Sequence, residues 1–369
     1  MSKLLKDIYD KEFLRTLCLK IESVFSDFDS QKFVTNTMDN SWDEKSFKER
    51  MMLIANTLGK FLPSDYNKAL FILKSVSVQC TGFEYMFFPA FVQLYGLDNY
   101  SDSIKALEFF TEYSSSEFAV RPFIIRYKEK MMKQMLLWTE SDNFHVRRLA
   151  SEGCRPILPW SPDLPAFRSD PTFILPILEK LKNDSSEYVR RSVANNLNSI
   201  SKDNPEVTIA LSKKWFGNNH ATDKIVKHGC RTLLKRGNAE VLHLFNFVKA
   251  NHIKIEKFIV QESVSFEEVL HFSFSLITRK KELGNLRIEY IISFKKKNGS
   301  LAGKIFKISE GFFKEAKKHV EKKYSFKKIS TRKYYPGTHK ISIVINGFEV
   351  AEQEFQLLAE KQYCNALNQ

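Results

Sequence analysis

Apolar positions in the first 250 residues recur with the period of an α-helix. Ser-Trp-Asp-Glu at 41–44 is a predicted capping box, and an apolar run with helical spacing follows it and ends before Pro63. The run consists of Phe47, Met51, Ile54, Leu58 and Leu62. Ser101 is the predicted N-cap of a second run, formed by Ile104, Leu107 and Phe110. The connections between runs are short and rich in Asn, Asp, Ser and Pro, so the pattern predicts an all-α region.

An internal repeat organises this region. Residues 142–150 resemble residues 185–193, and their Val-Arg-Arg triplets begin at Val146 and Val189, 43 residues apart. A fainter third copy places Thr222 33 residues after Val189. Such repeats are typical of HEAT-like units, which stack as helix pairs into a solenoid with a concave face. The alternative is that each triplet is merely a helix start with solvated arginines.

The periodicity changes to two between residues 250 and 265. Strands are predicted at 270–277, 286–294 and 301–308, with a turn at 295–299, and a hairpin joins 338–345 to 348–357 through Asn346-Gly347. Residues 310–324 are predicted to form a short helix. The chain is therefore expected to be multidomain, with an all-α HEAT-like-repeat solenoid at 1–250 and a small all-β Ig-like sandwich at 255–360.

Charge is concentrated in one segment of this chain. The 369 residues contain 57 Lys+Arg and 43 Asp+Glu, a net charge of +14. Residues 279–340 alone carry 19 basic and 5 acidic side chains, so the rest of the chain sums to zero. This excess favours an anionic partner, nucleic acid before an acidic membrane surface. Solvated surface lysines are the alternative.

Several classes of protein are disfavoured by what the sequence lacks. It shows no signal-peptide core, no apolar run long enough for a membrane span and no P-loop, dinucleotide or nucleophile-elbow motif. A zinc site is not expected, because no Cys/His pair has ligand spacing on both sides of a site, and no cofactor is expected. Its cysteines are odd in number and widely spaced, which is typical of buried thiols in a cytosolic protein; they are Cys18, Cys80, Cys154, Cys230 and Cys364.

Two glutamates stand out because each shortly precedes an Arg-Pro pair. Glu117 and Glu152 are 35 residues apart, close to one repeat, so they are predicted to converge on the concave face. The arginines expected around them are Arg121, Arg147, Arg148 and Arg155. Arginines bind phosphates, whereas carboxylates repel them and become useful where positive charge develops, as in glycosidic cleavage. The alternative is that both glutamates are ordinary ion-pair partners of these arginines.

Three strings resemble a known family: residues 82–98, Ser-Glu-Phe-Ala-Val-Arg-Pro-Phe at 116–123, and Arg-Arg-Leu-Ala-Ser-Glu-Gly-Cys-Arg-Pro at 147–156, continued by Leu-Pro-Trp at 158–160. They resemble the AlkC-type DNA alkylation-repair glycosylases of the HEAT-like-repeat superfamily. The resemblance implies excision of cationic alkylated bases (3-methyladenine, 3-methylcytosine, 1-methyladenine) from bent duplex DNA without a base-flipping pocket. It also implies that Glu117 and Glu152 line the active site.

One position departs from the family pattern. At the position where the family often carries an aspartate, this chain has Ser199, which is therefore the third catalytic candidate; Asp203, one turn further on, is the acid that could compensate. Trp160, in a proline-rich loop, is expected to stack on a base or sugar, and the alternative is that it is a packing anchor. The expected DNA-binding residues are Arg121, Arg147, Arg148, Arg155, Trp160, Lys295, Lys296 and Lys297.

These observations lead to one preferred function and two alternatives. The preferred one is a monomeric DNA glycosylase in the bacterial cytoplasm, associated with the nucleoid, whose solenoid carries the chemistry and whose basic β-domain clamps double-stranded DNA. A non-catalytic HEAT-repeat module that binds damaged or bent DNA, and a protein–protein adaptor, are the alternatives. The first alternative predicts salt-sensitive binding without base release, and the adaptor predicts no salt-sensitive DNA affinity.

Overall fold

A computed structural model describes residues 4–329 and 332–359, which form two compact units that divide between Cys230 and Arg231. The first unit begins with a 3-10 turn, Leu5–Ile8, and is otherwise helical. Its α-helices are α1 (Lys11–Glu22), α2 (Ser30–Thr37), α3 (Phe47–Phe61), α4 (Tyr66–Ser77), α5 (Phe87–Tyr95), α6 (Tyr100–Tyr113), α7 (Val120–Arg126), α8 (Lys128–Trp138), α9 (Phe144–Gly153), α10 (Pro165–Ser169), α11 (Leu175–Leu181), α12 (Glu187–Ile200), α13 (Pro205–Trp215) and α14 (His220–Gly229).

The helix starts differ from the sequence prediction at two places. The capping box of α3 is formed by Ser46 and Glu49: the Glu49 carboxylate accepts the Ser46 N–H at 2.8 Å. Ser41 instead precedes a separate 3-10 turn, because Lys45 is extended and breaks the helical path. Ser101 was also wrong as a cap, since α6 begins at Tyr100 with Asn99 at the N-cap position.

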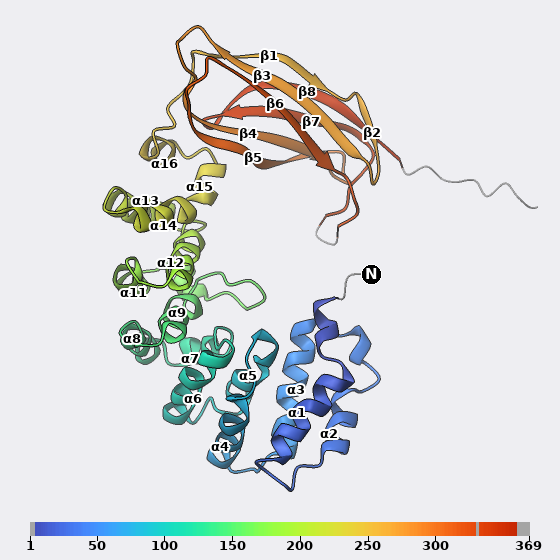
Figure 1. Cartoon of the computed structure of the whole chain (residues 1–369), viewed down its shortest axis with the longest axis vertical. Coiled ribbons are helices and arrows are strands. Elements are labelled where there is room, and N and C mark those ends of the chain that lie inside the picture. Colours follow the sequence, from blue (N-terminus) through green and yellow to red (C-terminus); the bar gives the residue numbers. More distant parts are fainter. Residues whose placement is uncertain (1–3, 330–331, 360–369) are drawn as a thin grey trace, which may run out of the picture. The chain divides into compact units, whose positions relative to one another are not determined.

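HEAT-like helix pairs build the second half of this unit. Figure 1 shows α9, α12 and α14 stacked in one layer and α8, α11 and α13 in the other. Val146, Val189 and Thr222 occupy equivalent buried positions near the starts of α9, α12 and α14, which confirms the predicted repeat.

Two glycines explain the shared Gly-Cys-Arg string at the ends of these helices. A Cβ on Gly153 would lie 2.6 Å from a methyl of Val120, and a Cβ on Gly229 would lie 2.6 Å from a methyl of Leu197. Only glycine therefore allows these helices to approach their neighbours so closely.

The second unit begins with α15 (Arg231–Lys235) and α16 (Ala239–Leu244) and continues as strands. Both helices precede residue 250, yet they cluster with the strands. The strands are β1 (Ile253–Val260), β2 (Ser263–Ser265), β3 (Val269–Thr278), β4 (Gly284–Lys295), β5 (Leu301–Phe313), β6 (Lys317–Ser325), β7 (Gly337–Ile345) and β8 (Phe348–Leu358). They form two sheets, ordered β1-β3-β6 and β2-β8-β7-β4-β5, which pack as an Ig-like sandwich (Figure 1).

The sandwich core comes from the inward faces of both sheets. Phe274 and Leu276 of one sheet and Ile288 and Ile343 of the other are fully buried in a single cluster. The predicted hairpin is confirmed: β7 and β8 pair antiparallel, and Asn346 and Gly347 both have positive φ, as a type I′ turn requires.

The helix predicted at 310–324 is wrong, because this segment contains the end of β5 and most of β6. β6 pairs with β3 along its whole length, yet Val320 is its one buried side chain. Lysines occupy four of its eight other positions, so the alternation that would identify a strand is weak.

The described cysteines are buried and free of disulfides. Burial raises the pKa of Cys154 to about 12 and that of Cys230 to about 11, so both stay as thiols at neutral pH. Cys364 lies outside the described residues. Within 4–329 and 332–359, we find no helix with the length and apolarity to cross a bilayer.

Candidate active site

Glu117 and Glu152 reach the site from different elements. Glu117 lies in the turn between α6 and α7, where the buried Ser116 hydroxyl donates to the Leu107 carbonyl at 2.7 Å and fixes the turn. Glu152 lies on the last turn of α9 and is only 4% exposed. Thus the two carboxylates come from successive helical pairs, as the 35-residue spacing predicts.

One guanidinium joins the two carboxylates. Arg148, one turn before Glu152, donates from Nη1 to Glu117 Oε2 and, at 3.1 Å, to Ser115 Oγ. Its Nη2 lies 3.7 Å from Glu152 Oε1. Burial works to lower the pKa of Arg148, but the two carboxylates outweigh it and the net shift is upward. Convergence and ion pairing, which the sequence left as alternatives, therefore hold together.

Glu152 has two further partners. Arg155 Nη1 donates to Glu152 Oε1, and the buried Ser192 hydroxyl of α12 donates to Oε2 at 2.6 Å. Ser199 belongs to the same cluster, because its Oγ accepts from Arg155 Nε and Nη2, both at 3.3 Å. The cluster thus contains two carboxylates and two guanidiniums, with a neutral hydroxyl where the resemblance expects an acid.

Asp203, the possible substitute for that acid, binds a different arginine. Its carboxylate accepts from Arg168 Nε at 2.7 Å and Nη2 at 2.9 Å. Arg168 Nη1 also donates to Asp163 at 2.8 Å. This carboxylate therefore serves a second ion-pair group.

Arg121 supports the site from below. It is 2% exposed, and four of its five N–H groups donate to backbone carbonyls. Their acceptors are the carbonyls of Gly153, Arg155 and Pro162, at 2.6–3.1 Å. Burial lowers its pKa to about 10. This geometry contradicts a phosphate contact, because the guanidinium is buried and its donors are already hydrogen-bonded to the end of α9 and the loop that follows.

The guanidinium of Arg147 also binds groups within the protein. Its Nε and Nη2 bind Asp184 at 2.6 and 3.0 Å, and its Nη1 donates to the carbonyls of Ser141 and Asp142, both at 2.9 Å. The hydrogen bond that Arg147 donates to Asp184 raises the pKa of Arg147. Arg147 therefore ties two helical pairs together, and the prediction that it binds DNA is not supported by this geometry.

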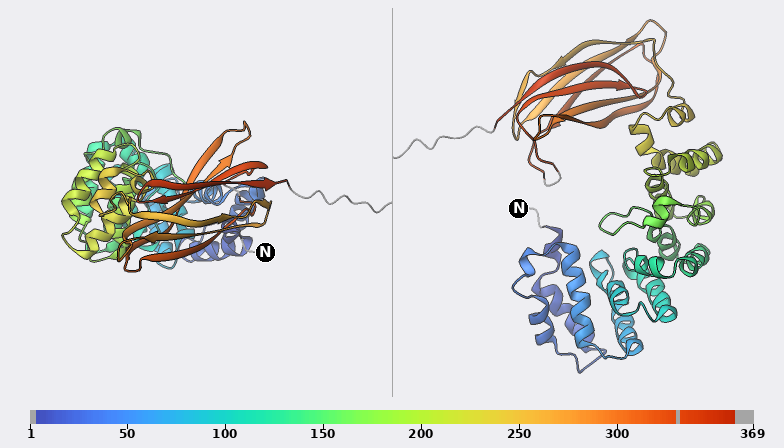
Figure 2. Two further views of the ribbon diagram at one scale, coloured as in Figure 1. Left: turned by 90° about the horizontal axis from the view of Figure 1, so that it is seen from above. Right: turned by 180° about the vertical axis from the view of Figure 1, so that it is seen from behind.

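Trp160 is presented to solvent on the loop after α9. Figure 1 and Figure 2 show this loop extending from the side of the stack that carries α9 and α12. Trp160 is 60% exposed at a φ of 64°, a strained value for a non-glycine residue. Its carbonyl accepts from Lys48 Nζ at 2.6 Å. An exposed ring on a fastened loop suits the predicted stacking role.

Sequence reasoning missed Lys48, Ser192 and Tyr188. Lys48 lies on α3, more than 100 residues from the loop that it holds, and burial followed by the charge of Arg121 lowers its pKa. Ser192 follows the second Val-Arg-Arg triplet, so the repeat was the one available signal for it. Tyr188 covers Arg148, with the guanidinium carbon 5.0 Å from the ring centre.

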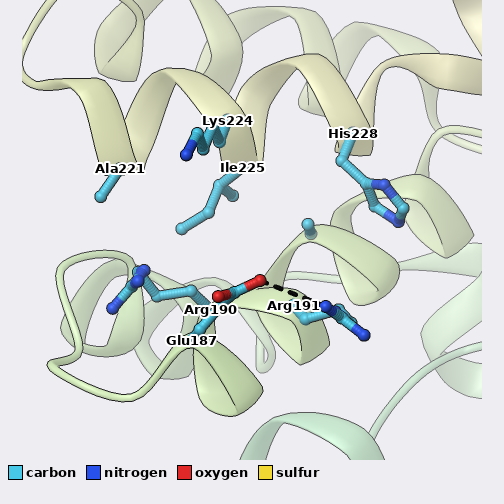
Figure 3. Close-up of a pocket in the computed structure, with 8 residues that line it drawn as sticks. Glu187, Arg190, Arg191, Ala221, Lys224, Ile225 and His228 are labelled. Atoms are coloured by element: carbon cyan, nitrogen blue, oxygen red, sulfur yellow. Dashed lines mark hydrogen bonds and ion pairs between the residues drawn. The ribbon is translucent and has the colours of Figure 1, made fainter.

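The next helical pair offers a second cationic surface. A pocket of about 270 Å³ between α12 and α14 is lined by Glu187, Arg190, Arg191, Ala194, Ala221, Lys224, Ile225 and His228 (Figure 3). Arg191 is the repeat equivalent of Arg148, and it pairs with Glu187 at 3.1 Å. Asn195 takes the place of Glu152 and binds His228 at 2.9 Å. The carboxylate cluster is therefore specific to the first of the two pairs.

The candidate lysines of the β-domain lie at the β4–β5 turn. Lys296 and Lys297 are exposed, and Lys295 is half-buried with its amine against Gly337. Gly299 completes the predicted turn, with its N–H donating to the Lys296 carbonyl at 3.0 Å.

Known proteins match both units of this chain. Residues 113–233 match a family described as DNA alkylation repair enzyme, and residues 254–359 match the C-terminal Ig-like domain of uncharacterised protein YhaZ. YhaZ of Bacillus subtilis (strain 168) is 43% identical over 355 residues, covering 96% of this chain and 99% of YhaZ.

A solved structure is similar over nearly the whole chain. It is the Pseudomonas fluorescens alkylpurine DNA glycosylase AlkC, bound to DNA containing an abasic site analog. The identity is 35% and the TM-score 0.92, with 97% of this chain and 100% of that chain covered.

Proposed function

This chain belongs to the AlkC family of DNA alkylation-repair enzymes, and from that premise we propose that it is a DNA glycosylase for cationic alkylated bases. Its proposed substrates are 3-methyladenine, 3-methylcytosine and 1-methyladenine in bent duplex DNA, and its product is an abasic site. One observation carries the proposal: Glu117 and Glu152, from successive helical pairs, meet at a single guanidinium.

The proposed mechanism follows from that geometry. Breaking the N-glycosidic bond of a cationic base leaves positive charge on the sugar, and a carboxylate stabilises this oxocarbenium-like state. Glu152 is the main carboxylate, because Ser192 and Arg155 hold it in one position. It also orients the attacking water, and Glu117 supports it.

The remaining polar groups position the DNA in this proposal. Arg148 binds a phosphate near the lesion, and Trp160 packs on the sugar or a neighbouring base. Arg155, which was also expected to bind DNA, is 8% exposed and paired with Glu152 and Ser199, so in this proposal it keeps Glu152 in place. The lysines of the β-domain attract the duplex. Arg121 and Arg147 keep the loop and the helical pairs in place.

Base release from methylated duplex DNA tests this function directly. We expect the wild type to release 3-methyladenine and 3-methylcytosine and the Glu117→Gln, Glu152→Gln double variant to release neither. Gln keeps the shape of each side chain, and thermal melting should confirm that the variant is folded. No release by wild type, or full release by the double variant, would sink the assignment.

A second candidate function is supported by the charge of the cluster. Its two guanidiniums match its two carboxylates, and Ser199 adds no acid. Such a neutral cluster suits a module that binds bent or damaged DNA without cleaving it. This candidate predicts salt-sensitive binding to an abasic-site duplex and no base release.

Either function makes double-stranded DNA the partner. We propose that the protein works as a monomer in the cytoplasm, associated with the nucleoid. Its mass by light scattering, alone and with one duplex, checks the stoichiometry.

A further inference from the structure

An aromatic ring lies over the guanidinium that links the two carboxylates. Tyr188, on the first turn of α12, is 43% exposed, and its ring centre is 5.0 Å from the guanidinium carbon of Arg148. Arg148 therefore sits in a cation site with three walls: the carboxylates of Glu117 and Glu152 and the face of Tyr188. We call these three side chains the cation site.

Neighbouring rings fix the orientation of Tyr188. His145 lies edge-on to it, with centroids 5.9 Å apart, and Phe144 lies edge-on at 6.3 Å. Burial, followed by the charge of Arg148, lowers the pKa of His145, so this imidazole is neutral at neutral pH. Burial raises the pKa of Tyr188, which keeps its hydroxyl protonated. The charged groups that act on Tyr188 are Arg148, Glu117 and Glu152.

The charges of this arrangement cancel, so catalysis requires that at least one arginine leaves its carboxylate. While both arginines remain paired, the carboxylates offer no net attraction to a cationic base or sugar. Arg155 is held by Ser199 as well as by Glu152. Arg148, in contrast, occupies the place between the two carboxylates where a further cation would be stabilised.

A guanidinium and an N-alkylated base share the relevant chemistry, because both are flat, delocalised cations. We propose that Arg148 occupies the cation site in the absence of DNA and yields it to the cationic nucleoside of the lesion. Tyr188 is then a specificity-determining residue that favours charged over neutral nucleosides. This inference rests on the proposed function. It adds that Tyr188 recognises the positive charge of the lesion, and that the Arg148 guanidinium leaves Glu117 and binds a phosphate when DNA is bound.

Two duplexes that differ by one charge test the exchange. One carries a pyrrolidine abasic analogue, which is protonated near the position of the sugar C1′, and the other carries a neutral tetrahydrofuran analogue. The readout is the ratio of their dissociation constants, neutral over charged, for the full-length protein. This ratio cancels contacts common to both duplexes and needs no turnover.

Tyr188→Leu should lower this ratio about threefold to tenfold, the range of a partly desolvated cation–π contact, and Tyr188→Phe should preserve it. Phe173→Leu is the matched control, because it removes an exposed ring that lies 5.0 Å from the Lys128 amine, outside the cation site, and it should leave the ratio unchanged. A folded Tyr188→Leu variant with the wild-type ratio would overturn the role of Tyr188.

Arg148→Gln should raise the ratio, since the internal competitor for the cation site is gone, even if affinity for both duplexes falls. A ratio equal to or below that of wild type would overturn the exchange. Failure of the proposed function is distinguishable, because it would appear as absent base release while the charge preference and its response to both variants persisted.

Discussion

Ser199 controls the charge of the cluster at the scale of one residue. It is 1% exposed and bonded to Arg155, so a carboxylate at this position would pair with that guanidinium and loosen its hold on Glu152. The cluster would then carry a net negative charge. We expect Ser199→Asp to raise the excision rate of 3-methyladenine on the order of tenfold under single-turnover conditions.

Ser199→Asn is the control for this substitution, because it has similar size without the charge. It should leave the rate within about twofold of wild type. If Ser199→Asp were no faster than Ser199→Asn, the charge of the cluster would not limit the reaction.

Arg121 is expected to matter for stability more than for DNA affinity. Lysine at this position cannot reach three carbonyls in the fork geometry of a guanidinium, and buried acceptors without donors are costly. Arg121→Lys should lower the free energy of unfolding by about 2–3 kcal/mol, measured in urea. Arg191→Lys, at an exposed arginine, should change it by less than about 0.5 kcal/mol. Equal effects would contradict the buried role.

Trp160, in contrast to Arg121, is expected to matter for DNA affinity more than for stability. Glycine adopts a positive φ without strain, and this gain of about 1 kcal/mol offsets the greater entropy of the unfolded chain. Trp160→Gly should therefore unfold close to the wild-type midpoint and bind an abasic-site duplex about tenfold more weakly. Unchanged DNA affinity would make Trp160 a surface residue without a role in binding.

Residue spacing predicted only part of this site. The 35 residues between Glu117 and Glu152 place them on successive helical pairs, because the repeat fixes that geometry. The carbonyls bound by Arg121 lie 32–41 residues away, at the end of α9 and in the irregular loop after it, so no periodicity predicts these contacts. An arginine in the sequence looks the same whether it faces a phosphate or a buried carbonyl.

At the scale of elements, the first arginine of each Val-Arg-Arg triplet holds its helix to the turn that precedes it. Arg147 donates to the carbonyls five and six residues before it, and Arg190 repeats this with Asp184 and Ser185 at 2.5 and 2.8 Å. The second arginine, Arg148 or Arg191, lies on the face that carries the site and its neighbouring pocket. The repeated triplet therefore combines a structural position with one that faces the candidate site or its neighbouring pocket.

Asp184 binds the first arginine of both triplets, Arg147 through its carboxylate and Arg190 through its backbone carbonyl. Its side chain is 5% exposed and binds Arg147 through both oxygens. Asp184→Ala should lower the free energy of unfolding by about 3–5 kcal/mol, because it leaves the largely buried Arg147 guanidinium without its carboxylate partner. Hydrogen exchange should show the loss of protection in α9 and α12. Glu187→Gln, in an exposed pair with Arg191, is the control and should leave exchange unchanged.

Whether an element could be predicted depended on how its side chains are buried. β4 and β7 have one strongly apolar face, and alternation located them within one or two residues. β6 buries only Val320 and presents lysines elsewhere, so its sequence resembles a solvated helix. Its pairing with β3 comes from tertiary structure, which local periodicity does not encode.

The largest scale concerns how the charge of the whole molecule is divided. Residues 279–340 hold the entire net excess, whereas the candidate active site balances two acids against two arginines. A catalytic cluster that stabilises cations cannot also be strongly basic. The attraction for DNA that we propose for the β-domain would separate these two electrostatic requirements.

The β4–β5 turn offers the sharpest test of this separation. Each phosphate contact by a lysine releases counterions and adds about 0.9 to the slope of log affinity against log salt. Changing Lys295, Lys296 and Lys297 to Ser should therefore reduce that slope by up to about 2.7 and weaken binding at low salt. The matched control changes the exposed Lys133, Lys213 and Lys214 of α8 and α13 to Ser, which removes the same charge from the outer helical layer. Single-turnover base release at saturating protein should be unchanged in the turn variant, because its chemistry resides at Glu152. Equal slopes for both triple variants would mean that the turn lysines are solvated surface and act only through net charge.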